Sequence, residues 1–130
     1  MRFEIDEVTQ HGLMTIAAGR TSVGRLKGIW KYESPPVIGK GYHVELSIDS
    51  PCQADIVQKK RVSPSVYFVE DTVIFQGICE DMDEDVYYIR FDIDWIEMLD
   101  IDTIASQKKK GEYLSFSANV YGISIYPYTL

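Results

Sequence analysis

Apolar and polar residues alternate with a period of two along much of this chain, and this alternation is its dominant pattern. The clearest case covers residues 41–49, where the apolar members are Tyr42, Val44, Leu46 and Ile48. Successive side chains of a strand point to opposite faces, so the pattern predicts a half-buried strand with one solvated face. Similar alternation predicts two more strands, over residues 25–32 and 86–94.

Short segments rich in β-branched and aromatic residues predict further strands. They are residues 3–8, 13–18, 54–58, 65–70, 72–79, 112–120 and 123–128. Turn residues separate them, as in Ser34-Pro35-Pro36, Ser63-Pro64 and Lys110-Gly111. Strands at this spacing predict an all-β, mainly antiparallel fold, either a small barrel or a sandwich. The five-stranded Greek-key barrel of the oligonucleotide/oligosaccharide-binding type is one architecture that fits.

Residues 94–110 carry signals for both helix and strand. Asp94 and Glu97 have the spacing of a helix capping box, and three lysines precede Gly111 as at a helix C-terminus. The isoleucines at 93, 96, 101 and 104 favour a strand. We expect a strand through Leu99 and then a turn or short helix, so the fold has at most one short helix around residues 95–109.

Length and composition predict one domain, residues 1–130, since no repeat or linker divides the chain. The two cysteines, Cys52 and Cys79, are too few for a secreted disulfide scaffold, and we expect buried thiols. The first residues are charged and include no apolar signal segment, and no apolar run approaches the roughly 20 residues that cross a bilayer. These features predict a cytoplasmic protein that does not associate with membranes.

The charge is negative overall and unevenly distributed. A net charge of -7 argues against nucleic acid as a partner and favours a basic protein. Residues 70–102 hold twelve of the twenty carboxylates with Arg90 as their only cation, whereas residues 20–40 carry five cations against Glu33. Two interpretations stay open: the segregation persists in space and steers a basic partner, or barrel closure pairs the two stretches.

The run from Glu80 to Asp85 is the strongest local feature. Asp81, Asp83 and Asp85 match the first spacings of a calcium loop, but Val86 replaces its glycine and the flanks are strands. We therefore expect an exposed hairpin tip and assign no metal site and no cofactor. The candidate partner-binding residues are the acidic run and the tyrosines that follow it: Glu80, Asp81, Asp83, Glu84, Asp85, Tyr87 and Tyr88.

No catalytic constellation stands out. The only histidines, His11 and His43, have no neighbouring nucleophile in the sequence, and no zinc spacing or glycine-rich nucleotide motif occurs. We assign no catalytic residues and expect a non-enzymatic protein-binding domain. A concrete form is a bacterial immunity-type protein that neutralises a basic partner. The alternative is a small carbohydrate-active hydrolase or sugar-binding protein that uses Asp92, Asp94 or Glu97 beside an aromatic residue.

Overall fold

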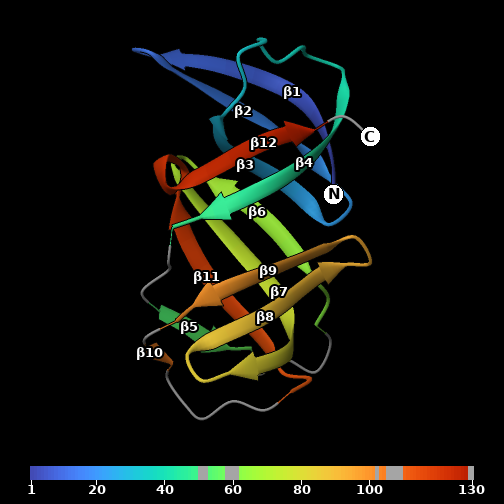
Figure 1. Cartoon of the computed structure of the whole chain (residues 1–130), viewed down its shortest axis with the longest axis vertical. Coiled ribbons are helices and arrows are strands. Elements are labelled where there is room, and N and C mark those ends of the chain that lie inside the picture. Colours follow the sequence, from blue (N-terminus) through green and yellow to red (C-terminus); the bar gives the residue numbers. More distant parts are fainter. Residues whose placement is uncertain (50–52, 58–61, 102, 105–109, 129–130) are drawn as a thin grey trace.

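The computed structural model describes residues 1–49, 53–57, 62–101, 103–104 and 110–128, and within them the chain is almost entirely β-strand (Figure 1). The elements are β1 (Arg2–His11), β2 (Met14–Thr21), β3 (Gly24–Trp30), β4 (Gly41–Ile48), β5 (Gln53–Ile56), β6 (Ser65–Val69), β7 (Thr72–Asp83), β8 (Val86–Asp92), β9 (Trp95–Asp100), β10 (Thr103–Ile104), β11 (Tyr113–Asn119), the 3-10 helix η1 (Val120–Gly122) and β12 (Ile123–Tyr128). No helix in these residues is long and apolar enough to cross a membrane.

Five strands close into a barrel. The ring runs β1-β2-β3-β12-β4 and returns to β1. The β3–β12 pairing is parallel and the other four are antiparallel. The predicted all-β, mainly antiparallel barrel is therefore confirmed.

The strands between β4 and β12 form the outer sheet, most of which lies below the barrel in Figure 1. Its central strand β7 pairs with β6, β8 and β11, β9 pairs with β8, and β5 lies between β11 and β10. The outer sheet joins the barrel where Gly24 of β3 pairs with Val66 of β6. Gly24 has a φ of 138°, and a Cβ there would lie 1.9 Å from the Val66 carbonyl oxygen, so only glycine fits.

One hydrophobic core runs through the barrel and the outer sheet. Leu26, Ile123 and Ile125 are fully buried inside the barrel. In the outer sheet the rings of Phe75 and Phe116 stack, with their centroids 5.0 Å apart. Burial of this apolar surface is the main force that holds the two parts together.

The strand prediction for residues 86–94 was wrong at its end. β8 stops at Asp92, and Ile93, expected on the buried face, lies in a turn and is 93% exposed. Residues 95–99 are in strand conformation, as expected, but they do not continue β8: they belong to a separate strand, β9, which folds back on β8. A turn of two residues leaves the chain no length to bury Ile93. The expected short helix falls partly on residues 105–109, outside the described residues.

The cations of residues 20–40 form ion pairs with carboxylates of β1 and with one carboxylate of residues 70–102. Arg20 pairs with Glu4 at 2.7 Å and Arg25 pairs with Asp6, both across strands of the barrel. Lys27 pairs with Asp71 at 3.7 Å, the only ion pair in the described residues that joins residues 20–40 to residues 70–102. Two of these three cations therefore pair with carboxylates of β1. Barrel closure brings only one cation of the basic segment into an ion pair with the acidic segment, among the described residues.

Candidate functional site

The acidic run forms the β7–β8 hairpin, as expected. The two strands pair up to Asp83 opposite Val86, and Glu84 and Asp85 form the turn. Glu84 has a φ of 55°, in the left-handed region. Asp83, Glu84 and Asp85 are all exposed. Three of the predicted carboxylates therefore project together from one end of the outer sheet.

Two of the predicted carboxylates are paired within the molecule. Both oxygens of Glu80 accept hydrogen bonds from the Arg90 guanidinium, at 3.0 and 2.9 Å. Asp81 lies 3.1 Å from the Lys110 ammonium and accepts a hydrogen bond from the Met82 amide. The Met82 amide and then Lys110 hold the pKa of Asp81 below its usual value. These internal cations partly neutralise the base of the hairpin.

The two candidate tyrosines point to opposite faces of β8. Tyr87 packs against the core, and burial, followed by the charge of Asp85, raises the pKa of its hydroxyl. Tyr88 is half-buried on the other face, opposite Asp81 on β7 and Met98 on β9. The structure therefore places Tyr88, and not Tyr87, on the same surface as the carboxylates.

Two rows of side chains across β7, β8 and β9 share this outer surface. One row is Asp81, Tyr88 and Met98, and the other is Asp83, Val86 and Asp100. We call these six residues the hairpin face. Met98 is 66% exposed, and Tyr88 and Val86 are half-buried. Sequence reasoning missed Val86, Met98 and Asp100, because only the register of three strands brings them beside the acidic run.

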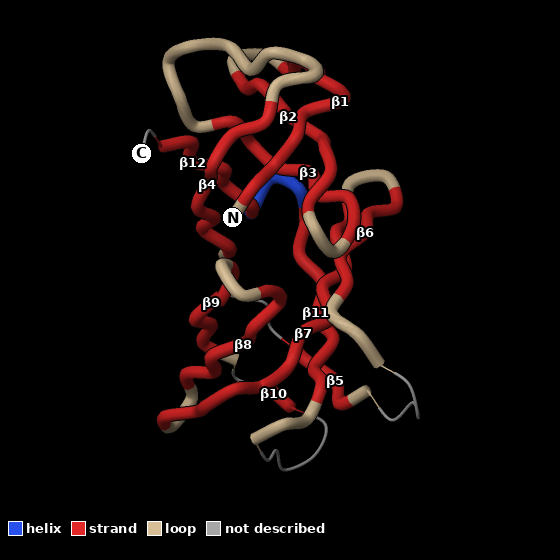
Figure 2. Tube along the Cα trace, turned by 90° about the vertical axis from the view of Figure 1, so that its right-hand side faces the viewer, coloured by secondary structure: helices blue, strands red, loops and turns tan. Residues whose placement is uncertain are grey.

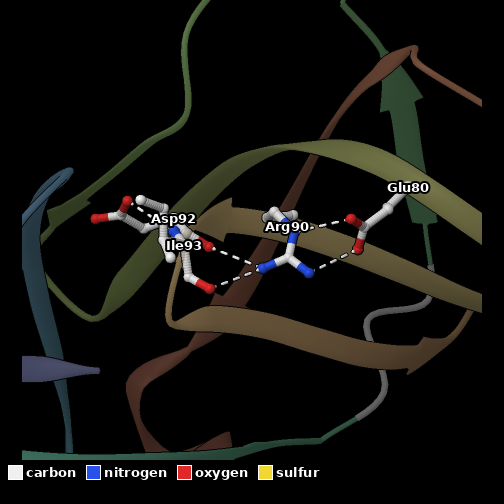
Figure 3. A network of polar contacts seen from close by, with 4 residues as sticks. All are labelled: Glu80, Arg90, Asp92 and Ile93. Carbon is white, nitrogen blue, oxygen red and sulfur yellow. Dashed lines mark hydrogen bonds and ion pairs between the residues drawn. The ribbon is translucent and has the colours of Figure 1, made fainter.

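Arg90 fastens the turn at the other end of β8. One of its terminal nitrogens donates to the backbone carbonyls of Asp92 and Ile93, at 3.1 and 3.0 Å, while the rest of its guanidinium holds Glu80 (Figure 3). The only cation that the sequence places in the acidic stretch is therefore a structural residue.

The three carboxylates of the carbohydrate alternative have separate positions. The Asp92 carboxylate accepts hydrogen bonds from the Ser22 hydroxyl and from the Ile93 amide, and these contacts lower its pKa. It is not among the residues that line a nearby cleft, whereas Asp94 and Glu97 are. The structure thus brings two of the three together and ties the third to the β2–β3 turn.

The cleft has a volume of about 530 Å³ and lies between β4 and β9. Figures 1 and 2 both show β9 of the outer sheet next to β4 of the barrel. Its two walls are residues 44–48 and 94–99, and Met1 and Tyr128 also line it. We call it the edge cleft. Its volume lies in the range of about 300–1,000 Å³ that is typical of ligand sites.

Glu97 is the unusual residue of the edge cleft. It shares the inner face of β9 with buried Trp95 and Leu99, and its carboxylate accepts a hydrogen bond from the Trp95 indole at 2.9 Å. Burial raises the pKa of Glu97 to about 7, against the hydrogen bond from Trp95 and the charge of the chain's amino group, with a smaller upward contribution from Glu45. Such a group exchanges a proton near neutral pH, which is typical of functional sites.

The other candidate chemistry is dispersed. In the part of the chain that the structure describes, no three His, Cys, Asp or Glu side chains could hold a metal ion. His11 lies against Tyr121 and His43 against Tyr128, in two separate surface contacts. Cys79 is buried, as expected, and its thiol donates to the Asp81 carbonyl at 3.6 Å; Cys52 lies outside the described residues.

Fold and surfaces together define an all-β protein built on a closed five-stranded barrel, with an acidic hairpin face and a cleft lined by three carboxyl groups. Comparison with models of known families, with curated proteins and with solved structures finds no match to this chain.

Proposed function

We propose that this chain is a non-enzymatic protein-binding domain that binds a basic partner through its hairpin face. One observation carries the proposal: strand register sets Val86, Tyr88 and Met98 side by side among Asp81, Asp83 and Asp100. Protein interfaces commonly have an apolar, aromatic-rich centre and a polar rim. An acidic rim around such a centre favours a partner with a basic surface.

The charge around this surface supports a cationic partner. In the described residues no ion pair involves Asp83, Glu84, Asp85 or Asp100, in contrast to Glu80 and Asp81. Unpaired carboxylates near a binding surface speed association with a positively charged protein, and do so more at low salt. A concrete form of this function is a bacterial immunity-type protein that masks a cationic site on a toxin.

The test is capture of the partner by the full chain, its identification by mass spectrometry, and measurement of Kd with the purified partner. We expect Tyr88→Ser with Met98→Ser to weaken binding at least tenfold, because it removes the apolar centre. Asp83→Asn with Asp100→Asn should weaken binding less and flatten its dependence on salt. Glu7→Gln with Glu33→Gln is the matched control, since it removes the same charge from exposed positions elsewhere.

Two outcomes would contradict the proposal. The first is a partner whose affinity is unchanged in both hairpin-face variants while those variants remain folded by circular dichroism. The second is an equal loss of affinity in the Glu7 and Glu33 control, which would show that overall charge matters and the location of the face does not.

The edge cleft favours a second candidate, the carbohydrate-active protein. Glu97, with a pKa of about 7, could serve as a general acid, and Asp94 or Glu45 as the second carboxylate. Trp95 is only 3% exposed, so Tyr128, 40% exposed, is the aromatic ring that a sugar could contact there. Hydrolysis of chromogenic glycosides that disappears in Glu97→Gln would support it, and no turnover by the unsubstituted chain would exclude the hydrolase.

A further inference from the structure

The walls of the edge cleft are strand edges, not sheet faces. Each wall is a run of consecutive residues, 44–48 on one side and 94–99 on the other. Because neighbouring side chains of a strand point to opposite faces, a cleft over a face would be lined by alternate residues. Lining by consecutive residues means that the backbones themselves border the cleft.

The hydrogen-bond phase of β9 shows which of its backbone groups point into the cleft. The Ile101 amide donates to the Asp85 carbonyl at 3.1 Å, at the position directly opposite it in the β8–β9 register. Bonded and non-bonded pairs alternate along an antiparallel ladder. Ile96 and Met98 are therefore in non-bonded pairs, and their N–H and C=O groups point away from β8. In the described residues no strand pairs with this side of β9.

The alternation of hydrogen-bonded and non-bonded pairs along β4 likewise shows which of its backbone groups point into the cleft. The Asp49 amide donates to the Gly122 carbonyl at 2.8 Å, so Leu46 and Ile48 are in non-bonded pairs with β12. Pro127, which has no amide hydrogen, lies opposite Val44, and the Val44 amide turns to the Met1 carbonyl, as this phase requires. The described β1–β4 pairing ends beside Val44, so the backbone groups of Leu46 and Ile48 face the cleft.

We propose that the edge cleft accepts an extended, basic segment of the partner protein as an added β-strand. An added strand satisfies exposed backbone groups of a sheet edge and places alternate side chains in adjoining pockets. The inference rests on the proposed function and specifies how the partner is held. The cleft adjoins the hairpin face at Met98, which belongs to both surfaces.

Charge selects the basic occupant. Three carboxyl groups, those of Glu45, Asp94 and Glu97, line the cleft, against one cation among its described lining residues, the amino group of Met1, which donates to the Val44 carbonyl at 3.2 Å. A lysine or arginine of the added strand can pair with Glu97 where the side chain is partly desolvated. Glu97 holds its proton up to about pH 7, so a cation that pairs with it displaces this proton. Affinity should therefore rise with pH between 6 and 8.

The experiment uses a blocked decapeptide of alternating lysine and threonine, titrated into the full chain by calorimetry at pH 6 and pH 8. Matched probes are the same peptide with glutamate for lysine and one with proline at its centre. We expect the lysine peptide to bind at least tenfold more tightly than either probe, and more tightly at pH 8. In Glu97→Gln the pH effect should become smaller, because the carboxyl group at position 97 no longer titrates.

A pair of variants separates the backbone from the side chain. Ile96→Pro removes an amide that faces the cleft, and proline is tolerated at such a position on an edge strand. Ile96→Thr shortens the side chain and keeps the amide. We expect Ile96→Pro to weaken lysine-peptide binding at least tenfold relative to Ile96→Thr, with both variants folded by circular dichroism.

Equal affinity of these two variants would overturn strand addition. So would equal affinity for the lysine and glutamate peptides, or binding of a neutral oligosaccharide with no binding of the lysine peptide. The proposed function is contradicted by a different result: a captured partner whose Kd is unchanged by the hairpin-face substitutions at Tyr88 and Met98. A partner that is lost in those variants but retained by Ile96→Pro would leave the function in place and exclude this mode of recognition.

Discussion

At the scale of single residues, Glu84 and Glu97 lie at positions that are unfavourable for a glutamate. Glu84 has a φ of 55° in the β7–β8 turn, where a side chain is unfavourable and glycine is not. Glu97 shares the inner face of β9 with Trp95 and Leu99, where an apolar residue would pack. Both positions cost stability, and cost of this kind is often found at functional sites.

The strain at Glu84 can be measured with two variants. Glu84→Gly and Glu84→Ala remove the same charge, but only glycine relaxes the left-handed backbone. We expect the free energy of unfolding of the glycine variant to exceed that of the alanine variant by about 1 kcal/mol, measured by denaturant titration. Equal stability of the two variants would show that this turn carries no strain.

Because the pKa of Glu97 is raised in the folded chain, this residue makes the fold less stable as the pH rises. Its pKa is about 7 in the folded chain, above the usual value of 4.5, so between these values the folded chain holds a proton that the unfolded chain releases. Stability from this group is complete below pH 4.5 and falls as the pH rises through 7. We expect the unfolding free energy to drop by up to about 3 kcal/mol between pH 5 and pH 8.

Glu97→Gln is the control for this pH dependence. The variant cannot titrate at position 97, so its drop between pH 5 and pH 8 should be smaller by that amount. The pKa values of Asp81 and Asp92 are lowered from the usual value of 3.8, so these two carboxylates change the stability of the fold only at more acidic pH than this range. An identical pH profile in the variant and the unsubstituted chain would contradict the assignment.

At the scale of elements, the β8–β9 hairpin contributes residues to both proposed binding surfaces. Arg90 holds it through two backbone carbonyls at the turn and through Glu80 on β7. Asp92 ties the same turn to Ser22 of the barrel. The position of β9 beside β4 therefore depends on polar contacts at the turn as well as on the buried Trp95 and Leu99.

A substitution at Arg90 tests this dependence. Arg90→Lys keeps the charge but loses the planar fork that reaches a carboxylate and two carbonyls at once. We expect amide hydrogen exchange of residues 93–99 to become several-fold faster, and more so than in Glu80→Gln, which leaves the carbonyl contacts intact. Amides of the β1–β2 hairpin serve as the internal reference. Unchanged exchange in Arg90→Lys would show that packing alone positions β9.

At the scale of the whole molecule, the continuous core predicts cooperative unfolding of the barrel and the outer sheet. The two tryptophans report separately, since Trp30 lies in β3 of the barrel and Trp95 in β9. We expect the single-tryptophan variants Trp30→Phe and Trp95→Phe to show one transition each, coincident with that seen by circular dichroism. A Trp95 transition at lower denaturant, distinct from the circular dichroism transition of the same variant, would show that the outer sheet unfolds on its own.

Much of the fold could be predicted because local patterns coincide with local structure. The alternation at Val44, Leu46 and Ile48 matches the inner face of β4, and the turn between Asp83 and Val86 falls inside the acidic run. The prediction was wrong at Ile93, which is exposed in a turn. When a turn has only two residues, two strands joined by a hairpin show nearly the same alternation of apolar and polar residues as one long strand. The binding candidates were only partly predictable: the acidic run was visible, but its neighbours on β9 were not.

The sequence by itself determined that the chain forms antiparallel strands, where most of them lie, and that residues 80–85 carry exposed charge, since these depend on neighbours close in the chain. Only the tertiary structure decided that β12 closes the barrel, that Met98 lies beside Tyr88, and that Glu97 faces β4 across a cleft. Those outcomes depend on the register between strands and on which edges remain unpaired. Register and edge pairing arise from contacts between distant residues, which no short window of sequence contains.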